Sequence, residues 1–254
     1  FQSFGFFGLF FLGFVGCSDN AGGGNLVSLV EAESEESKDQ RTQELVSDPV
    51  SYTSALSLIR GHLWVAKRLS MTNFFDHAAM HAKHPEDEIY SDLVDVFELK
   101  GLKGFASELS IFSSSVISGD KKAIEQDYQA LVDSIDVTEE LIELTTGELL
   151  ELINRLISQA AREYAIGIID GQVDNVHEYQ DARGFIEVAI DLTRIHEQKA
   201  DLAENHLMVI GLLKDRLENL LEMWPTLLPL GELPFDASRL FGAAADVEIL
   251  SLSL

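Results

Sequence analysis

The chain has 254 residues, of which 43 are acidic and 18 basic, so its formal net charge is -25 at pH 7. This charge argues strongly against nucleic acid as a partner, because a phosphate backbone would be repelled at long range. Hydrophobic residues still make up 46% of the chain, enough for a sizeable core, and one cysteine cannot form an internal disulfide.

An uncharged run of aromatic and aliphatic residues occupies positions 1–15, shortly before the only cysteine, Cys17. The run is short for a transmembrane helix and is typical of the apolar core of a secretory signal peptide. The end of the run, Phe14-Val15-Gly16-Cys17, is followed at once by polar residues and resembles a bacterial lipobox, in which the cysteine is diacylated and becomes the new N-terminus. We therefore expect a truncated signal peptide over residues 1–16 and a lipid on Cys17, with an incidental cysteine as the alternative. The protein would be exported to the periplasmic face or the surface of the outer membrane as a lipoprotein.

Residues 17–47 combine three consecutive glycines with an acidic stretch, a composition typical of a flexible tether. The pattern changes at Asp48-Pro49, which predicts an N-cap followed by proline at the first helical position. We therefore expect one helical bundle domain over residues 48–254.

Apolar residues recur at helical spacing through this domain, and no alternating strand pattern appears. Pro85 predicts a new helix start, because a proline disfavours helical geometry at the residue before it. The strongest periodicity runs through residues 139–169, and a long helix is expected from Asn175 to about Met223. The predicted fold is all-α, a mostly up-and-down bundle of six to eight helices.

Four of the seven histidines, His62, His77, His81 and His84, are concentrated in one part of the chain. His77 and His81 are four residues apart, so on one helix they face the same way and could chelate one metal ion. Glu88 extends this stripe, and His62 could complete the set from an earlier helix. Imidazole and carboxylate ligands suit iron, copper or zinc. Ordinary surface or capping histidines are the alternative.

A second polar group surrounds the turn between two long predicted helices. Glu163 precedes this turn, and Glu178, Tyr179 and Asp181 follow it. Carboxylates on facing helices commonly hold iron and related metals in helical bundles. A capping and salt-bridge network that stabilises the turn is the alternative. The Glu-x-x-His pairs of a buried di-iron bundle are absent from the sequence, which disfavours an oxygen-activating enzyme.

The extracytoplasmic helical region of bacterial high-affinity iron permease homologues is similar to the stretch EYAIGIIDGQVDNVHEYQDARGFIEVA. The segments GHLWVAKRL and HAKHPEDEIYSDL are similar to exported helical proteins associated with imelysin-like metal-uptake components. The Arg-Glu-x-x-Glu signatures of the permease's membrane helices are missing, so transport itself is not implied. The resemblance implies an accessory that binds or hands over a metal ion, with matching positions at Glu163, Glu178, Tyr179 and Asp181.

The sequence contains no Gly-x-Ser-x-Gly, Walker or Rossmann pattern, so we expect no enzymatic activity. We predict a lipid-anchored envelope protein that binds a transition metal ion, with a metal-uptake membrane protein as partner. Binding by neutral histidines and ionised carboxylates would weaken below about pH 6. The alternatives are a non-enzymatic interaction module without a metal site, and a metalloenzyme with an open coordination position.

Overall fold

A computed structural model describes residues 37–140, 142–199 and 202–254 of the chain. The predicted signal peptide and Cys17 lie outside the described residues, and so does most of the predicted tether. Residues 39–254 form one compact unit. No helix in the described ranges is long and apolar enough to cross a membrane.

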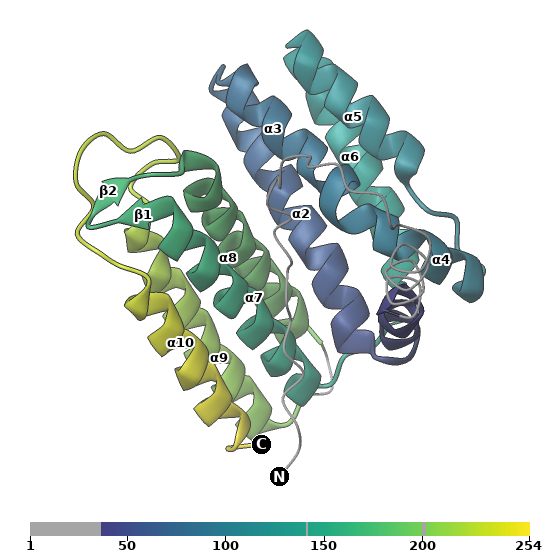
Figure 1. The fold of residues 1–254 in the computed structure, drawn as a ribbon. Helices are drawn as coiled ribbons and strands as arrows, with labels where there is room; N and C mark the ends of the chain where they lie inside the picture. Colours follow the sequence, from purple (N-terminus) through teal and green to yellow (C-terminus); the bar gives the residue numbers. More distant parts are fainter. Residues whose placement is uncertain (1–36, 141, 200–201) are drawn as a thin grey trace, which may run out of the picture. The chain divides into compact units, whose positions relative to one another are not determined.

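The described residues are almost entirely helical, which confirms the predicted all-α class (Figure 1). The elements in chain order are α2 (Pro49–Met71), α3 (Phe75–Pro85), the π-helix η1 (Glu86–Tyr90), α4 (Ser91–Lys100), α5 (Ala106–Ser118), α6 (Lys121–Glu139), α7 (Thr146–Gly167), β1 (Ile168–Ile169), β2 (Gln172–Val173), α8 (Val176–Glu197), α9 (Glu204–Leu220), the 3-10 helix η2 (Leu221–Met223) and α10 (Ser238–Ser251). The two strands pair antiparallel and form a short hairpin between α7 and α8. In these described ranges the nine α-helices α2 to α10, with a helical segment over residues 37–47 before them, exceed the six to eight helices predicted.

Two of the predicted helices are shorter than the apolar periodicity indicates. The predicted run through residues 139–169 is interrupted, because Thr145 caps α7 through a reciprocal capping box with Glu148. The long helix predicted from Asn175 ends at Glu197, and α9 starts at Glu204. Since α8 and α9 pack against each other, the chain must reverse between them, whereas periodicity reports only which face of a helix is apolar.

The folded unit also begins earlier than the predicted boundary at residue 48. Residues 39–47, which the composition assigned to the tether, are helical, and Leu45 is fully buried in a cluster with residues of α2. Asp48 is the N-cap of α2 as predicted, with its carboxylate accepting from the backbone amides of Val50 and Ser51 at 3.1 and 3.2 Å. The last part of the predicted tether therefore belongs to the core.

Pro85 does not start a new helix, contrary to the prediction. It is the last residue of α3, and the chain continues in helical geometry through the π-helix η1 into α4. Proline removes one backbone hydrogen bond, and a π-turn is a common way for a helix to absorb such an irregularity. His84 therefore remains on the same helix as His81.

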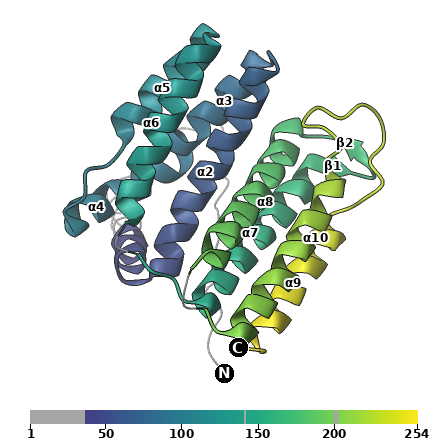
Figure 2. The same cartoon turned by 180° about the vertical axis from the view of Figure 1, so that it is seen from behind.

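Two hydrophobic clusters form the core. One is built mainly from α7, α8, α9 and α10, and the other from α2 to α6. Within the first cluster each helix packs against the next and α10 packs back on α7, so these four helices close into a bundle. Figures 1 and 2 show α2 running beside α7 and α8, and the contacts of α2 with both helices agree with this view.

The helices α2 and α8 approach most closely where Gly61 faces Gly184. A Cβ atom at Gly184 would clash with the carbonyl oxygen of Gly61 and would lie 2.8 Å from Cγ2 of Val65. A Cβ atom at Gly61 would clash with the ring of Phe185. Because backbone atoms cannot move aside as a side chain can, the two glycines determine how near the helices come.

We expect Gly184→Ala to destabilise the protein by about 1–3 kcal/mol, because the added methyl group forces α2 away from α8. Urea denaturation followed by circular dichroism measures this change in the free energy of unfolding.

Gly211→Ala on α9 is the matched control, since no atom lies within 4 Å of the added Cβ. This substitution should leave stability unchanged or raise it by about 0.4–1 kcal/mol. Equal effects of the two substitutions would contradict a close helix contact at Gly184.

Candidate metal site

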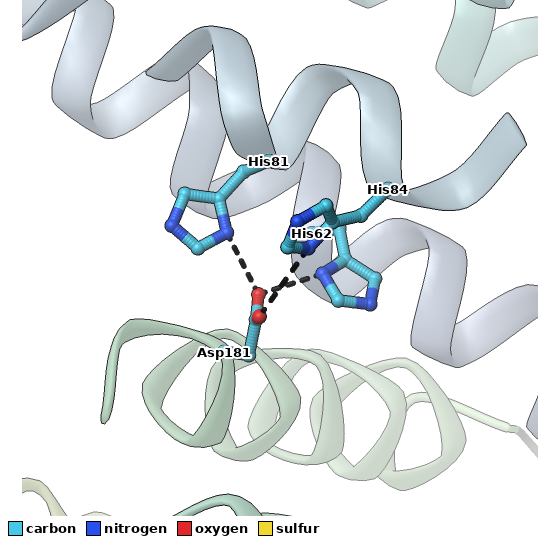
Figure 3. Close-up of side chains that lie close together, drawn as sticks. All are labelled: His62, His81, His84 and Asp181. Carbon is cyan, nitrogen blue, oxygen red and sulfur yellow. Dashed lines mark hydrogen bonds and ion pairs between the residues drawn. The ribbon is translucent and has the colours of Figure 1, made fainter. Parts of the chain in front are cut away.

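Three histidines surround one aspartate where α2, α3 and α8 meet (Figure 3). His62 lies on α2, His81 and His84 lie on α3, and Asp181 lies on α8. One ligand atom from each of the four residues lies within 4.8 Å of those from the others. We call these four residues the His3Asp cluster. Sequence reasoning had placed them in two separate groups.

The carboxylate of Asp181 is the centre of the cluster. Its Oδ1 lies 2.6 Å from Nδ1 of His62 and 2.8 Å from Nδ1 of His81. Its Oδ2 lies 3.8 Å from Nδ1 of His84. An ionised carboxylate only accepts hydrogen bonds, so the Nδ1 atoms of His62 and His81 are the donors.

The local folding of each helix brings these side chains together. His62 follows Gly61, so the close approach of α2 to α8 places it within reach of Asp181. The rings of His62 and Phe185 pack nearly perpendicular to each other, with 5.3 Å between ring centroids. His81 and His84 are three residues apart on an uninterrupted helix and therefore share one face.

The cluster is largely buried, with exposed fractions of 5% for His62, 0% for His81 and 2% for Asp181. Burial alone would raise the pKa of Asp181, but the positive charges and hydrogen bonds of His62 and His81 outweigh it and hold this pKa well below its ordinary value. His84 is partly exposed, and its ion pair with Asp181 raises its pKa against the opposing effect of burial. Asp181 is thus an ionised carboxylate in the interior.

A buried glutamine holds the ring of His81 from the other side. Nε2 of His81 lies 2.7 Å from Oε1 of Gln180, and Nε2 of Gln180 donates to the carbonyl oxygen of Leu227 at 2.8 Å. This second bond orients the amide so that Oε1 faces His81, and Nε2 of His81 must therefore donate. Nδ1 is then the nitrogen of His81 that could bind a metal ion.

The donor set fits a transition metal ion. In a tetrahedral zinc site with imidazole and carboxylate bonds of about 2.0–2.2 Å, neighbouring ligand atoms lie about 3.3–3.6 Å apart. The four ligand atoms lie within 4.8 Å of one another, so an ion would draw the more distant ones together, and it would replace the short contacts of Asp181 with His62 and His81. Three imidazoles and one carboxylate suit iron, copper and zinc, and they do not select among these metals.

Two further predicted residues on the α3 side lie outside the cluster. His77, one turn before His81, instead places its Nδ1 3.3 Å from Nε2 of His177. Glu88 is exposed on η1, although its charge contributes to the raised pKa of His84.

On the α7 and α8 side, Glu163 and Glu178 form a separate pair of carboxyl groups that share a hydrogen bond. Burial, this hydrogen bond and the charge of Glu163 raise the pKa of Glu178 to about 8. Tyr179 was predicted as a ligand, but it is buried in the core and its hydroxyl donates to the carbonyl oxygen of Thr226 at 2.8 Å. Residues two positions apart lie on nearly opposite sides of an α-helix, so Tyr179 cannot share the direction of Asp181.

Sequence reasoning missed two residues near the cluster. His177 precedes Asp181 by four residues, the same spacing that drew attention to His77 and His81, so its position could have been inferred. Gln180 has no comparable signal, because its role depends on the carbonyl group of Leu227, far along the chain.

We expect Glu178→Gln to become more stable relative to the unchanged protein as the pH rises from about 5 to about 9. The pKa of Glu178 is raised from 4.5 to about 8, so the folded state holds a proton that the unfolded state releases. The stability contributed by this proton is complete below pH 4.5 and is lost as the pH rises through about 8. Glutamine has no proton to lose. Denaturation in the presence of a chelator, at a series of pH values, measures the difference.

Glu248→Gln, at an exposed position on α10, serves as the control and should show a difference that does not change with pH. If the Glu178 and Glu248 variants have the same pH profile, the shared proton between Glu163 and Glu178 is not supported.

Comparison with known proteins identifies one related region. Residues 143–234 match the family model of the iron permease-associated 4-helix bundle domain. The comparisons with curated proteins and with solved structures each give no match. The matched range contains α7, α8 and α9 and therefore most of the closed bundle. Asp181 lies inside this range, whereas the three histidines of the His3Asp cluster precede it.

The predicted similarity to imelysin-like proteins remains untested by these comparisons. The predicted relation of the chain to the helical region of iron permease homologues is confirmed for residues 143–234.

Proposed function

We propose that this protein binds a transition metal ion at the His3Asp cluster and serves metal uptake at the cell envelope, with iron as the first candidate. The observation that carries the proposal is a buried, ionised carboxylate on which three imidazoles converge. The match of residues 143–234 to an iron permease-associated bundle supports iron among the metals that this donor set suits.

The number of histidines favours a metal ion over a purely structural ion pair. One carboxylate needs one cationic partner for charge balance, and burying more titratable groups than this costs free energy. Here three imidazoles from two helices face Asp181. A cation that takes four ligands accounts for all of them, because each imidazole then supplies a lone pair instead of a competing proton.

Binding would exchange protons for the ion. Asp181 is already ionised, whereas His81 must release the proton of Nδ1 while Nε2 stays bonded to Gln180. The affinity therefore falls as the pH drops and the imidazoles become protonated. The net charge of -25 favours the approach of cations over that of anions. His84, which is partly exposed, lies where a ligand exchange with solvent or an acceptor is easiest.

The ion would be cargo, and the protein a non-catalytic accessory to a metal-uptake membrane protein. We propose that a lipid on Cys17 holds it at the periplasmic face or the surface of the outer membrane. The lipobox-like residues around Cys17 and the iron permease-associated bundle support this assignment. Mass spectrometry of the protein purified from membranes of the expressing cell would reveal the lipid.

We expect the protein to bind one equivalent of Fe²⁺ tightly under anaerobic conditions and His84→Ala to weaken this tight binding by about a hundredfold or more. Loss of a residue that only supports a metal ligand typically costs 10–100-fold, so loss of a ligand itself should cost at least as much. Competition with a chromophoric chelator measures the affinity.

Glu88→Gln is the control, because Glu88 is exposed on η1 and outside the cluster. Because the charge of Glu88 acts on His84 only from outside the cluster, this variant should change the affinity far less than His84→Ala does. Absence of any bound metal in the unchanged protein, with Fe²⁺, Zn²⁺ and Cu²⁺ each tried, would disprove the metal function and favour the interaction module.

Gln180→Met should weaken metal binding by about 10–100-fold, because the ring of His81 loses the acceptor that orients it. Methionine has a similar volume, so the change removes hydrogen bonds without leaving a large cavity. The same chelator competition measures the effect, and Gln129→Met at an exposed position on α6 is the control. An unchanged affinity would show that Gln180 does not orient a ligand.

A further inference from the structure

A second pair of histidines lies one helical turn from the His3Asp cluster, on two of the same helices. His77 precedes His81 by four residues on α3, and His177 precedes Asp181 by four residues on α8. Nδ1 of His77 lies 3.3 Å from Nε2 of His177, and Nδ1 of His81 lies 2.8 Å from Oδ1 of Asp181. The two helices thus make two successive contacts through metal-binding side chains, one turn apart.

The separation of the two nitrogens suits shared coordination of one ion. In a tetrahedral site with bonds of about 2.0–2.1 Å, neighbouring ligand atoms lie about 3.3–3.4 Å apart. The distance of 3.3 Å between His77 and His177 matches this value. In the described ranges no third histidine, cysteine or carboxylate joins the pair, so water or a ligand from solution would complete the coordination.

The imidazole rings form an unbroken row from this pair into the cluster. The distances between ring centroids are 5.4 Å for His77 and His177, 5.5 Å for His177 and His81, 5.7 Å for His81 and His84, and 5.5 Å for His84 and His62. At the start of the row His77 and His177 are partly exposed, whereas the next ring, that of His81, is fully buried. An ion bound at the outer pair would therefore have the buried ligands as its next neighbours.

We propose that His77 and His177 form an outer, weaker metal site that captures a divalent transition metal ion and passes it to the His3Asp cluster. This inference rests on the proposed function of the cluster. Two neutral imidazoles bind a cation less tightly than three imidazoles with a carboxylate. His177 is also the second residue of α8, where the positive end of the helix dipole opposes a cation. Both effects shorten the time for which the outer pair holds an ion, as a transfer site requires.

The test compares the unchanged protein with the double variant His77→Ala/His177→Ala, using Co²⁺ because its visible absorption reports nitrogen ligands. Equilibrium titration counts the bound ions, and stopped-flow mixing measures the rate of loading. We expect the double variant to keep one tightly bound ion with unchanged affinity and to lose a second, weaker equivalent. Its loading should be about tenfold slower, because the outer pair no longer concentrates the ion near the cluster.

Two further variants serve as controls for this test. His206→Ala removes a histidine on α9, outside the row, and should load as fast as the unchanged protein. His77→Gln/His177→Gln keeps polar side chains at both positions, so slow loading in this variant would exclude a simple packing defect.

Equal stoichiometry and equal loading rates in the double variant and the unchanged protein would overturn the outer site and leave the pair as a hydrogen bond between two imidazoles. Failure of the proposed function looks different, since the unchanged protein would then bind no Co²⁺ at the cluster either, and both proposals would fall.

Discussion

The contact between Gly61 on α2 and Gly184 on α8 determines the position of every other part of the candidate site. Without Cβ atoms at these positions the two helix backbones come close enough for His62 to hydrogen-bond Asp181. Since α3 packs on α2, it follows the same placement and delivers its histidines to the same carboxylate. A separation of the helices by one methyl group would therefore affect both the core and the site.

The charge of Asp181 is the second constraint. Glu178, on the same helix, shows how strongly the pKa of a buried carboxyl group depends on the residue that it faces. Glu178 lies three residues earlier on the same helix, yet its pKa is raised to about 8, whereas the pKa of Asp181 is held well below its ordinary value. Burial opposes ionisation at both positions. Asp181 faces His62 and His81, which stabilise its charge, whereas Glu178 faces Glu163, which favours a shared proton. The two carboxyl groups therefore suit different roles.

The candidate site combines two parts of the chain, of which only the second lies in the range that matches a known family model. Asp181 and Gln180 lie in the range that matches the iron permease-associated bundle, and the histidines lie on α2 and α3, before this range. The bundle formed by α7 to α10 closes on itself, with its own hydrophobic cluster. We infer that metal binding in this protein needs the preceding helices as well as the matched bundle, because three of the four ligands come from them.

The sequence by itself determined the helical class, the N-cap at Asp48 and the two groups of candidate ligands, because these depend on residues near one another in the chain. Helical spacing also placed His77 and His81 on one face. Only the tertiary structure decided that His62 and Asp181 meet, that Glu88 stays exposed and that Tyr179 belongs to the core. Periodicity assigns a residue to one side of its helix, whereas the helix that covers this side is determined by the packing of the whole unit.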